Sequence, residues 1–76
     1  MATGIAYERS TPGDRIRRLR KNADLVQREL ADRVDMSRPL IAAWENGDCT
    51  PRLDEFKSLA RALNTTPEYL AFGRVG

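Results

Sequence analysis

The side chains of this sequence that could do chemistry are mainly guanidinium, amide and carboxylate groups. Its 76 residues include no histidine and one cysteine, Cys49. A lone thiol without histidine provides neither a zinc site nor a Cys–His nucleophile pair, and it cannot form an internal disulfide. The acidic residues lack the paired spacing of acid–base catalysis, and there is no glycine-rich phosphate loop. We therefore expect no enzyme activity, no metal and no cofactor, with Cys49 as a loop residue in a reducing compartment.

The richest segment for binding chemistry is 27–47, whose pattern predicts two short helices joined by a tight turn. Apolar residues recur at i, i+1 and i+4 in both halves: Leu30, Ala31 and Val34, then Leu40, Ile41 and Trp44. Between them, Asp35 tolerates left-handed backbone, Met36 can fill the corner and Ser37 can cap the next helix. This spacing is typical of a DNA-binding helix-turn-helix and of an ordinary helical hairpin, and the window alone favours neither.

The outward face of the second helix carries groups that could contact DNA bases. With Ile41 and Trp44 inward, a helical period turns the following residues outward: Arg38, Pro39, Ala42, Ala43 and Asn46. The Arg38 guanidinium could bond both acceptors of a guanine, or it could be solvated or bind phosphate. Ala42 and Ala43 could touch thymine methyl groups or simply favour the helix, whereas Pro39 offers only shape or apolar contact.

Five helices and no strands must position these groups, so the predicted fold class is all-α. The cap-plus-proline pairs Thr11-Pro12 and Thr66-Pro67 start the first and last helices, and Gly47 and Asn64 are helix stops. The expected helices run from Pro12 to about Ala23, from Val26 or Gln27 to Val34, from Arg38 to Asn46, from about Leu53 to Leu63, and from Pro67 onward.

Residues 1–11 show no periodicity and are expected to form a flexible arm, although Ile5 and Tyr7 could dock. The folded domain then covers 12–73 and a short tail covers 74–76. The expected inward residues outside the central segment are Ile16, Leu19, Ala23, Leu53, Phe56, Leu59, Ala60, Leu63 and Leu70. Because Val26 has no capping oxygen, we expect Asp24 to cap the second helix through an Asp-x-x-Gln box.

Net charge is only +2, but the first helix contains a basic run beside a single acidic residue, Asp14. The run consists of Arg15, Arg17, Arg18, Arg20 and Lys21. Such a run is usually a solvated helix face, and beside a helix-turn-helix it could also attract DNA phosphates. No stretch approaches the length of a membrane span and no signal peptide is evident. We expect a cytoplasmic protein without a membrane partner.

Residues 13–73 resemble the phage repressor and Cro-like helix-turn-helix family, also called xenobiotic-response-element-like. The resemblance is carried by IRRLR, Leu25-x-Gln27-x-Glu29-Leu30-Ala31, Ser37, Ile41-x-x-Trp44-Glu45-Asn46-Gly47, Pro51, Ala62-Leu63 and Tyr69-Leu70. It implies a compact five-helix, lambda-repressor-like domain. The third helix is then expected to enter the major groove of operator DNA, usually in a dimer.

The resemblance also implies roles for single residues. Arg20 and Glu45 correspond to a buried structural ion pair, and Asn46 and Arg52 to contacts with the sugar–phosphate chain. Gln27 corresponds to a residue that contacts phosphate or supports the base-contacting residues. Asp48 replaces a residue that is often basic, and Arg52 replaces a small cap residue. The full set expected at DNA is Gln27, Arg28, Ser37, Arg38, Pro39, Ala42, Ala43, Asn46 and Arg52.

Two functions remain open at this point. The first is a homodimeric transcriptional regulator, a repressor or a controller protein, on a pseudo-palindromic double-stranded DNA operator. The alternative is an antitoxin-type module that neutralises a partner toxin and represses its own operon. Tyr69 and Phe72 are candidates for a dimer or partner surface, although Tyr69 is more easily explained as closing the core.

Overall fold

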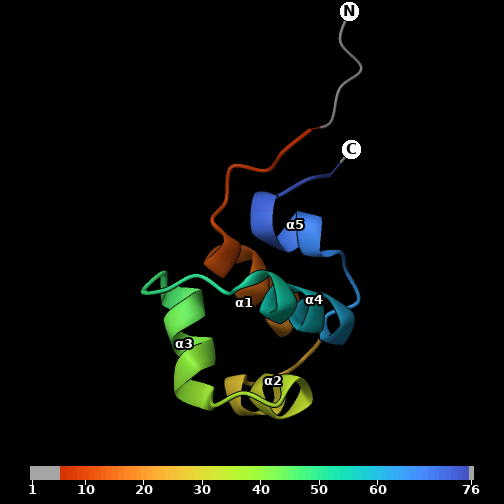
Figure 1. Ribbon diagram of the computed structural model, residues 1–76. Coiled ribbons are helices and arrows are strands. Elements are labelled where there is room, and N and C mark those ends of the chain that lie inside the picture. Colours follow the sequence, from red (N-terminus) through yellow and green to blue (C-terminus); the bar gives the residue numbers. More distant parts are fainter. Residues whose placement is uncertain (1–5, 76) are drawn as a thin grey trace, which may run out of the picture.

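The computed structural model describes residues 6–75, which form five α-helices (Figure 1). The helices are α1 (Pro12–Asn22), α2 (Gln27–Val34), α3 (Arg38–Asn46), α4 (Leu53–Ala62) and α5 (Pro67–Phe72). The all-α prediction is confirmed, and the expected helix bounds hold to within one residue where an end was given. In the described range no strand forms, and no helix is long and apolar enough to cross a membrane.

Three helices begin at a side-chain cap, as the sequence predicts. The Thr11 hydroxyl accepts the Asp14 N–H at 3.1 Å, and the Asp14 carboxylate accepts the Thr11 N–H at 3.3 Å. The Ser37 hydroxyl accepts the Leu40 N–H at 3.3 Å, and Thr66 caps α5 in the same way. These bonds satisfy amides that have no partner inside a helix, so they set where each helix starts.

The expected Asp24 cap is wrong. Asp24 has a φ of +58° and lies in the turn that ends α1, and the N-cap residue of α2 is Val26. The Glu29 carboxylate accepts the Val26 N–H at 2.9 Å, and the Glu55 carboxylate accepts the Arg52 N–H at 2.7 Å. Each of these helix starts therefore keeps the carboxylate half of a capping box without the hydroxyl half.

The core lies between the five helices, and its least exposed apolar side chains are Ile16, Leu30, Ile41, Leu59 and Leu70. For two of the expected inward residues the prediction is wrong. Ala23 is exposed because α1 ends at Asn22, and Leu53 is 66% exposed because it begins α4 beyond the edge of the core. Leu19 is only partly buried and packs against the core.

The turn between α2 and α3 has the predicted form. Asp35 has a φ of +58°, and the Met36 N–H donates to the Ala31 carbonyl at 2.9 Å. Met36 is partly buried against the core. Because this turn is closed by its own hydrogen bonds, α2 and α3 form a unit of fixed geometry.

Helix α3 packs mainly against α1 and α2, at one side of the molecule (Figure 1). The contact with α1 is close at Gly13, where an added Cβ would lie 2.4 Å from the Trp44 carbonyl oxygen. Gly47, with a φ of +81°, ends α3 in left-handed backbone. The side of α3 that faces away from α1 and α2 is left open.

The first and last described residues pair with each other. Tyr7 and Arg74 form an antiparallel bridge, flanked by a bond from the Glu8 N–H to the Gly73 carbonyl at 2.8 Å. Part of the expected arm therefore has hydrogen-bond partners, whereas Ile5 lies outside the described residues. The domain bounds 12–73 stay a prediction.

Candidate nucleic-acid interface

The open side of α3 carries most of the groups expected at DNA. Arg38, Pro39 and Asn46 are exposed, and Ala42 and Ala43 are half-buried. Within the described residues Arg38 makes no ion pair, so its guanidinium donors face solvent. This face combines one cation at the helix start with small side chains that allow close approach of a ligand.

The only acidic residue of α3 is turned away from this face. Glu45 is 3% exposed and pairs with Arg20, whose Nε lies 2.7 Å from Oε2 and whose Nη2 lies 3.0 Å from Oε1. Arg20 also donates to the Leu25 carbonyl at 2.8 Å. This two-point pair ties α1 to α3, and it leaves the open face without a negative charge from α3 itself.

Glu45 accepts further hydrogen bonds that keep it ionised. Gln27 Nε2 donates to Oε1 at 3.2 Å, and Arg17 Nε lies 3.4 Å from the same oxygen. Burial alone would raise the pKa of Glu45, but the bonds from Arg20, Gln27 and Arg17 outweigh it and lower that pKa. Gln27, expected to contact phosphate or to support base-contacting residues, is thereby held against α3.

The remaining expected contacts lie outside this network. Arg28 and Ser37 are exposed, and the Ser37 hydroxyl is engaged in capping α3. The Arg52 side chain is 81% exposed, with Nε 3.8 Å from Glu55 on the next turn. Their exposure is compatible with contacts to a large ligand, but no bond of Arg28 or Arg52 links it to α3.

Residues 16–70 match the family model described as "Helix-turn-helix". The chain belongs to this helix-turn-helix family. Relatives include the HTH-type transcriptional regulator DicA of Escherichia coli strain K12, which is 36% identical over 63 residues, 83% of this chain and 47% of that protein. Repressor protein C2 of Salmonella phage P22 is 34% identical over 61 residues, 80% of this chain and 28% of that protein. The chain thus spans less than half the length of these two relatives.

Solved structures agree with this assignment. The P22 c2 repressor in complex with synthetic operator 9T has a TM-score of 0.79 at 32% identity and covers 82% of this chain and 94% of that chain. The restriction-modification controller protein C.AhdI from Aeromonas hydrophila has a TM-score of 0.74 at 32% identity and covers 78% of this chain and 89% of that chain. Most of the helix-turn-helix domain, not only its central motif, therefore superimposes on these proteins.

Sequence reasoning missed how fully the basic run of α1 is used inside the helix-turn-helix domain. Arg17 Nη2 donates to Asn46 Oδ1 at 3.0 Å, and Arg18 Nη2 lies 2.9 Å from the Glu8 carboxylate. With Arg20 on Glu45, these arginines hold neighbouring segments in place. A merely solvated face does not describe these three side chains, whereas attraction of DNA phosphates by the basic run stays a prediction.

Arg15 is the least expected of this group because it is 2% exposed. Its Nε donates to the Leu70 carbonyl at 3.1 Å, and its Nη1 donates to the carbonyl and hydroxyl oxygens of Ser10. A cation beside the last carbonyls of α5 also interacts favourably with the helix dipole. Its position directly before the buried Ile16 is the only sequence signal for this burial.

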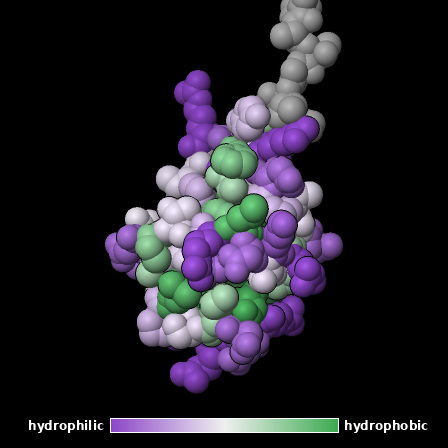
Figure 2. All heavy atoms as spheres, viewed as in Figure 1, coloured by the Kyte–Doolittle hydropathy of each residue, from purple (hydrophilic) through white to green (hydrophobic). Residues whose placement is uncertain are grey.

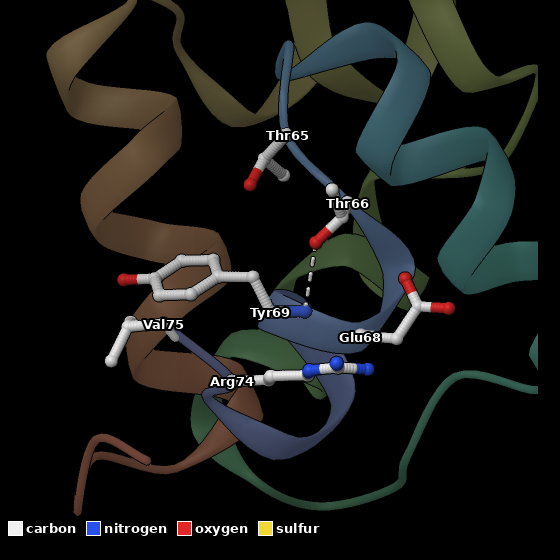
Figure 3. A pocket seen from close by; sticks show the side chains of 6 residues that line it. All are labelled: Thr65, Thr66, Glu68, Tyr69, Arg74 and Val75. Carbon is white, nitrogen blue, oxygen red and sulfur yellow. Dashed lines mark hydrogen bonds between the residues drawn. The ribbon is translucent and has the colours of Figure 1, made fainter. Parts of the chain in front are cut away.

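Tyr69 is engaged within the domain. Its hydroxyl donates to Glu8 at 2.8 Å and accepts from Arg18, whose guanidinium lies 6.0 Å from the ring centre. The hydrogen bonds from Arg18 and Tyr69 lower the pKa of Glu8, whereas burial and the bond to Glu8 raise the pKa of Tyr69. Figure 3 shows the Tyr69 ring beside Val75, at a surface hollow of about 510 Å³ that Arg74 and Glu68 also line.

Phe72, in contrast, is 68% exposed. Together with Leu53 it flanks a surface hollow of about 290 Å³, which is lined by Thr50, Pro51, Leu53, Phe56, Pro67, Glu68, Ala71 and Phe72. We call this the α4–α5 hollow. On the face seen in Figure 2, hydrophobic side chains are interspersed with hydrophilic ones rather than forming one wide patch. Exposed apolar side chains next to an apolar hollow are typical of a surface that binds another protein.

Proposed function

We propose that this helix-turn-helix chain is a sequence-specific regulator of transcription that binds a pseudo-palindromic double-stranded DNA operator as a homodimer. The observation that carries the proposal is the open face of α3, where Arg38 is exposed, whereas the charge of the buried Glu45 is paired with Arg20. An α-helix of this size fits the major groove of B-DNA. The likeness to the P22 c2 repressor, solved with an operator, supports this proposal.

Base recognition is assigned to the N-terminal half of α3. Arg38 would donate two hydrogen bonds to the N7 and O6 acceptors of guanine. Pro39, Ala42 and Ala43 lack donors in their side chains and would contribute shape and contact with thymine methyl groups. Because only one side chain offers strong hydrogen bonds, part of the sequence preference is assigned to the shape of the DNA.

Affinity for the DNA backbone is assigned to residues beside the α3 face. Arg28 and Arg52 provide exposed cations, and Gln27 and Asn46 provide amide donors. The Ser37 hydroxyl already accepts a backbone N–H, so its remaining donor is the hydroxyl proton. These contacts would fix the position of α3 in the groove without selecting a base.

The dimer surface is assigned to the α4–α5 hollow. A two-fold axis would place Phe72 of each copy against the apolar lining of the other, and it would also cover Leu53. Tyr69 is a weaker candidate because its hydroxyl is already paired with Glu8 and Arg18. Repressor and controller functions are both compatible with such a dimer, and the chain is similar to a repressor of phage P22 and to the controller protein C.AhdI.

The same hollow supports the second candidate, an antitoxin-type module. If the chain is monomeric in solution, Phe72 and Leu53 would be free to bind a different protein, such as a toxin. A simple measurement distinguishes the two functions. The measured mass of a homodimer changes with protein concentration without any other protein present. A small protein that co-purifies at fixed stoichiometry would favour the antitoxin.

Selection of randomised duplex DNA on the purified protein at two salt concentrations tests the proposed function. A two-fold symmetric motif is expected, with half-site centres about 34 Å apart, near 10 bp. Affinity should fall steeply with salt, because each neutralised phosphate contributes a slope of about −0.9 in log K against log salt. Enrichment of no motif, with binding that is only unspecific, would contradict a sequence-specific regulator.

A further inference from the structure

The side chain of Asn46 is held on one side by Arg17. Arg17 Nη2 donates to Asn46 Oδ1 at 3.0 Å, and the same nitrogen lies 3.4 Å from the Glu45 carbonyl oxygen. We propose that Arg17 is a positioning residue, which orients the Asn46 amide so that its NH₂ group faces a DNA phosphate. This inference rests on the proposed function and adds to it a residue outside the expected DNA-contacting set.

The chemistry of the two groups fixes the orientation of the amide. An asparagine amide has an acceptor oxygen at one end and two donor hydrogens at the other, whereas a guanidinium only donates. The opposite orientation would bring the NH₂ of Asn46 against the donors of Arg17. Contact with Arg17 therefore selects the orientation in which Nδ2 points away from α1, and the exposed position of Asn46 leaves that end accessible.

The selected orientation suits a phosphate. Phosphate oxygens accept hydrogen bonds and do not donate them, so they bind the NH₂ end of an amide and are repelled by its carbonyl end. Without Arg17, the terminal torsion of asparagine has a broad, roughly two-fold energy profile, and both ends would face the ligand for part of the time. Loss of the orienting bond should then weaken binding by about two- to tenfold per half-site.

Arg17 can be replaced without leaving a buried charge unpaired. Its side chain is 39% exposed, whereas Glu45 keeps its two-point pair with Arg20 and its bond from Gln27. Arg17→Met retains much of the aliphatic stem and removes every donor. Lys21→Met is a matched control, because it removes one positive charge from the exposed surface of α1 one turn further along.

A first test uses the free protein and needs no DNA. In the wild type, ¹⁵N relaxation of the Asn46 side-chain amide should report a restrained group, since Arg17 holds its oxygen. Arg17→Met should make this amide markedly more mobile, whereas Lys21→Met should leave its mobility unchanged. The thermal midpoint of unfolding should stay unchanged. Equal mobility of the Asn46 amide in the wild type and Arg17→Met would overturn the orienting role.

The second test is a double-mutant cycle for binding to the selected operator. Arg17→Met should weaken binding in the wild type and have little further effect in Asn46→Ala, because the oriented group is then absent. Lys21→Met should have the same effect in both backgrounds. If Arg17→Met costs the same in both backgrounds and lowers the salt slope by about 0.9 per half-site, Arg17 contacts phosphate itself and the proposal is wrong.

Asn46→Asp tests which end of the amide faces DNA. The aspartate would pair with Arg17 but offer only acceptors to a phosphate, so binding should be weaker than in Asn46→Ala. Wild-type affinity in Asn46→Asp would contradict a donor role. If the wild type selects no operator, the proposed function fails and this inference falls with it, whereas an additive cycle on a selected operator removes this inference alone.

Discussion

The arginines of this chain differ in what accepts their hydrogen bonds, and that difference separates structural roles from the proposed binding role. Arg20 donates to a buried carboxylate and Arg15 to backbone carbonyls, so both stabilise the fold. Arg38 has no ion pair within the described residues and stands at the exposed start of α3. Residue type alone could not make this distinction, because the acceptor of Arg15 on α5 lies 55 residues away in sequence.

Replacing Arg38 should change the sequence preference more than the fold. Arg38→Ala is expected to relax selection at one base position of each half-site, because a two-point bond to guanine contributes about 1–3 kcal/mol of discrimination. Repeated selection of randomised duplexes would measure the change. Arg52→Ala is the control and should weaken binding to all sequences alike. Unchanged preference at every position in Arg38→Ala would assign base recognition elsewhere.

Replacing Glu45 should instead reduce stability. Glu45→Gln leaves the largely buried Arg20 guanidinium without its counterion, and breaking a buried pair by removing one partner costs about 3–5 kcal/mol. Urea unfolding of the wild type and the variant measures this loss. Glu29→Gln, an exposed carboxylate at the start of α2, is a matched control and should cost much less.

Glu45 should also make the stability of the fold depend on pH. The pKa of Glu45 is lowered in the folded protein from its usual value of 4.5, so its stabilising contribution is fully present above about pH 4.5. That contribution is lost as pH falls through the lower pKa of the folded state. Unfolding midpoints measured between pH 7 and pH 3 should therefore fall less steeply in Glu45→Gln than in the wild type.

At the scale of elements, the close approach of α1 and α3 depends on a glycine inside a helix. An added Cβ at Gly13 would meet the Trp44 carbonyl oxygen at 2.4 Å, whereas one at Gly47 would meet nothing within 4 Å. Alanine usually stabilises a helix by about 0.5–1 kcal/mol relative to glycine. At Gly13 the opposite is expected, because α1 would have to move away from the helix that carries Arg38.

Two glycine replacements separate this steric effect from a backbone effect. Gly13→Ala should lower both the unfolding midpoint and the affinity for the operator, whereas Gly47→Ala should cost about 1–2 kcal/mol through its left-handed backbone alone. Gly47→Asn should recover part of that loss, since asparagine tolerates this conformation. Calorimetry and operator binding of the three variants provide the comparison. A stabilised Gly13→Ala protein would contradict the tight contact.

The sequence predicted these elements well where a local rule determines them. Caps at Thr11, Ser37 and Thr66 and the left-handed stop at Gly47 depend on neighbouring residues alone. Periodicity failed at element ends, as at Ala23 and Leu53, because it does not tell where the facing helix stops.

Prediction of the candidate site from the sequence was limited in the same way. The outward face of α3 follows from Ile41 and Trp44, but the partners of Arg17 and Tyr69 lie 29 and 61 residues away. Such long-range pairs carry no periodic signal in a single sequence. The proposed positioning role of Arg17 therefore depends on the packing of α1 against α3, which no local pattern predicts.

At the scale of the whole molecule, the α4–α5 hollow should determine the oligomeric state. Leu53→Asp and Phe72→Asp would each place a charge in an apolar contact, and both are expected to favour the monomer. Sedimentation at several concentrations measures the change, with weaker operator binding as the consequence. Tyr69→Phe is the control and should leave the mass unchanged. A wild-type protein that stays monomeric at high concentration would instead favour a different protein partner.

The pairing of residues 6–8 with 73–75 makes the described backbone almost a closed ring. The Val75 N–H donates to the Ala6 carbonyl at 2.9 Å, beside α5 and apart from α3 (Figure 1). In a polypeptide limited to residues 6–75, joining position 75 to position 6 through a short linker should therefore create a circular molecule without distorting it. Closing a loop of about this length would remove roughly 4 kcal/mol of chain entropy from the unfolded state. A circular form that melts at a higher temperature and binds the same operator would extend the repertoire of engineered, exopeptidase-resistant DNA-binding domains.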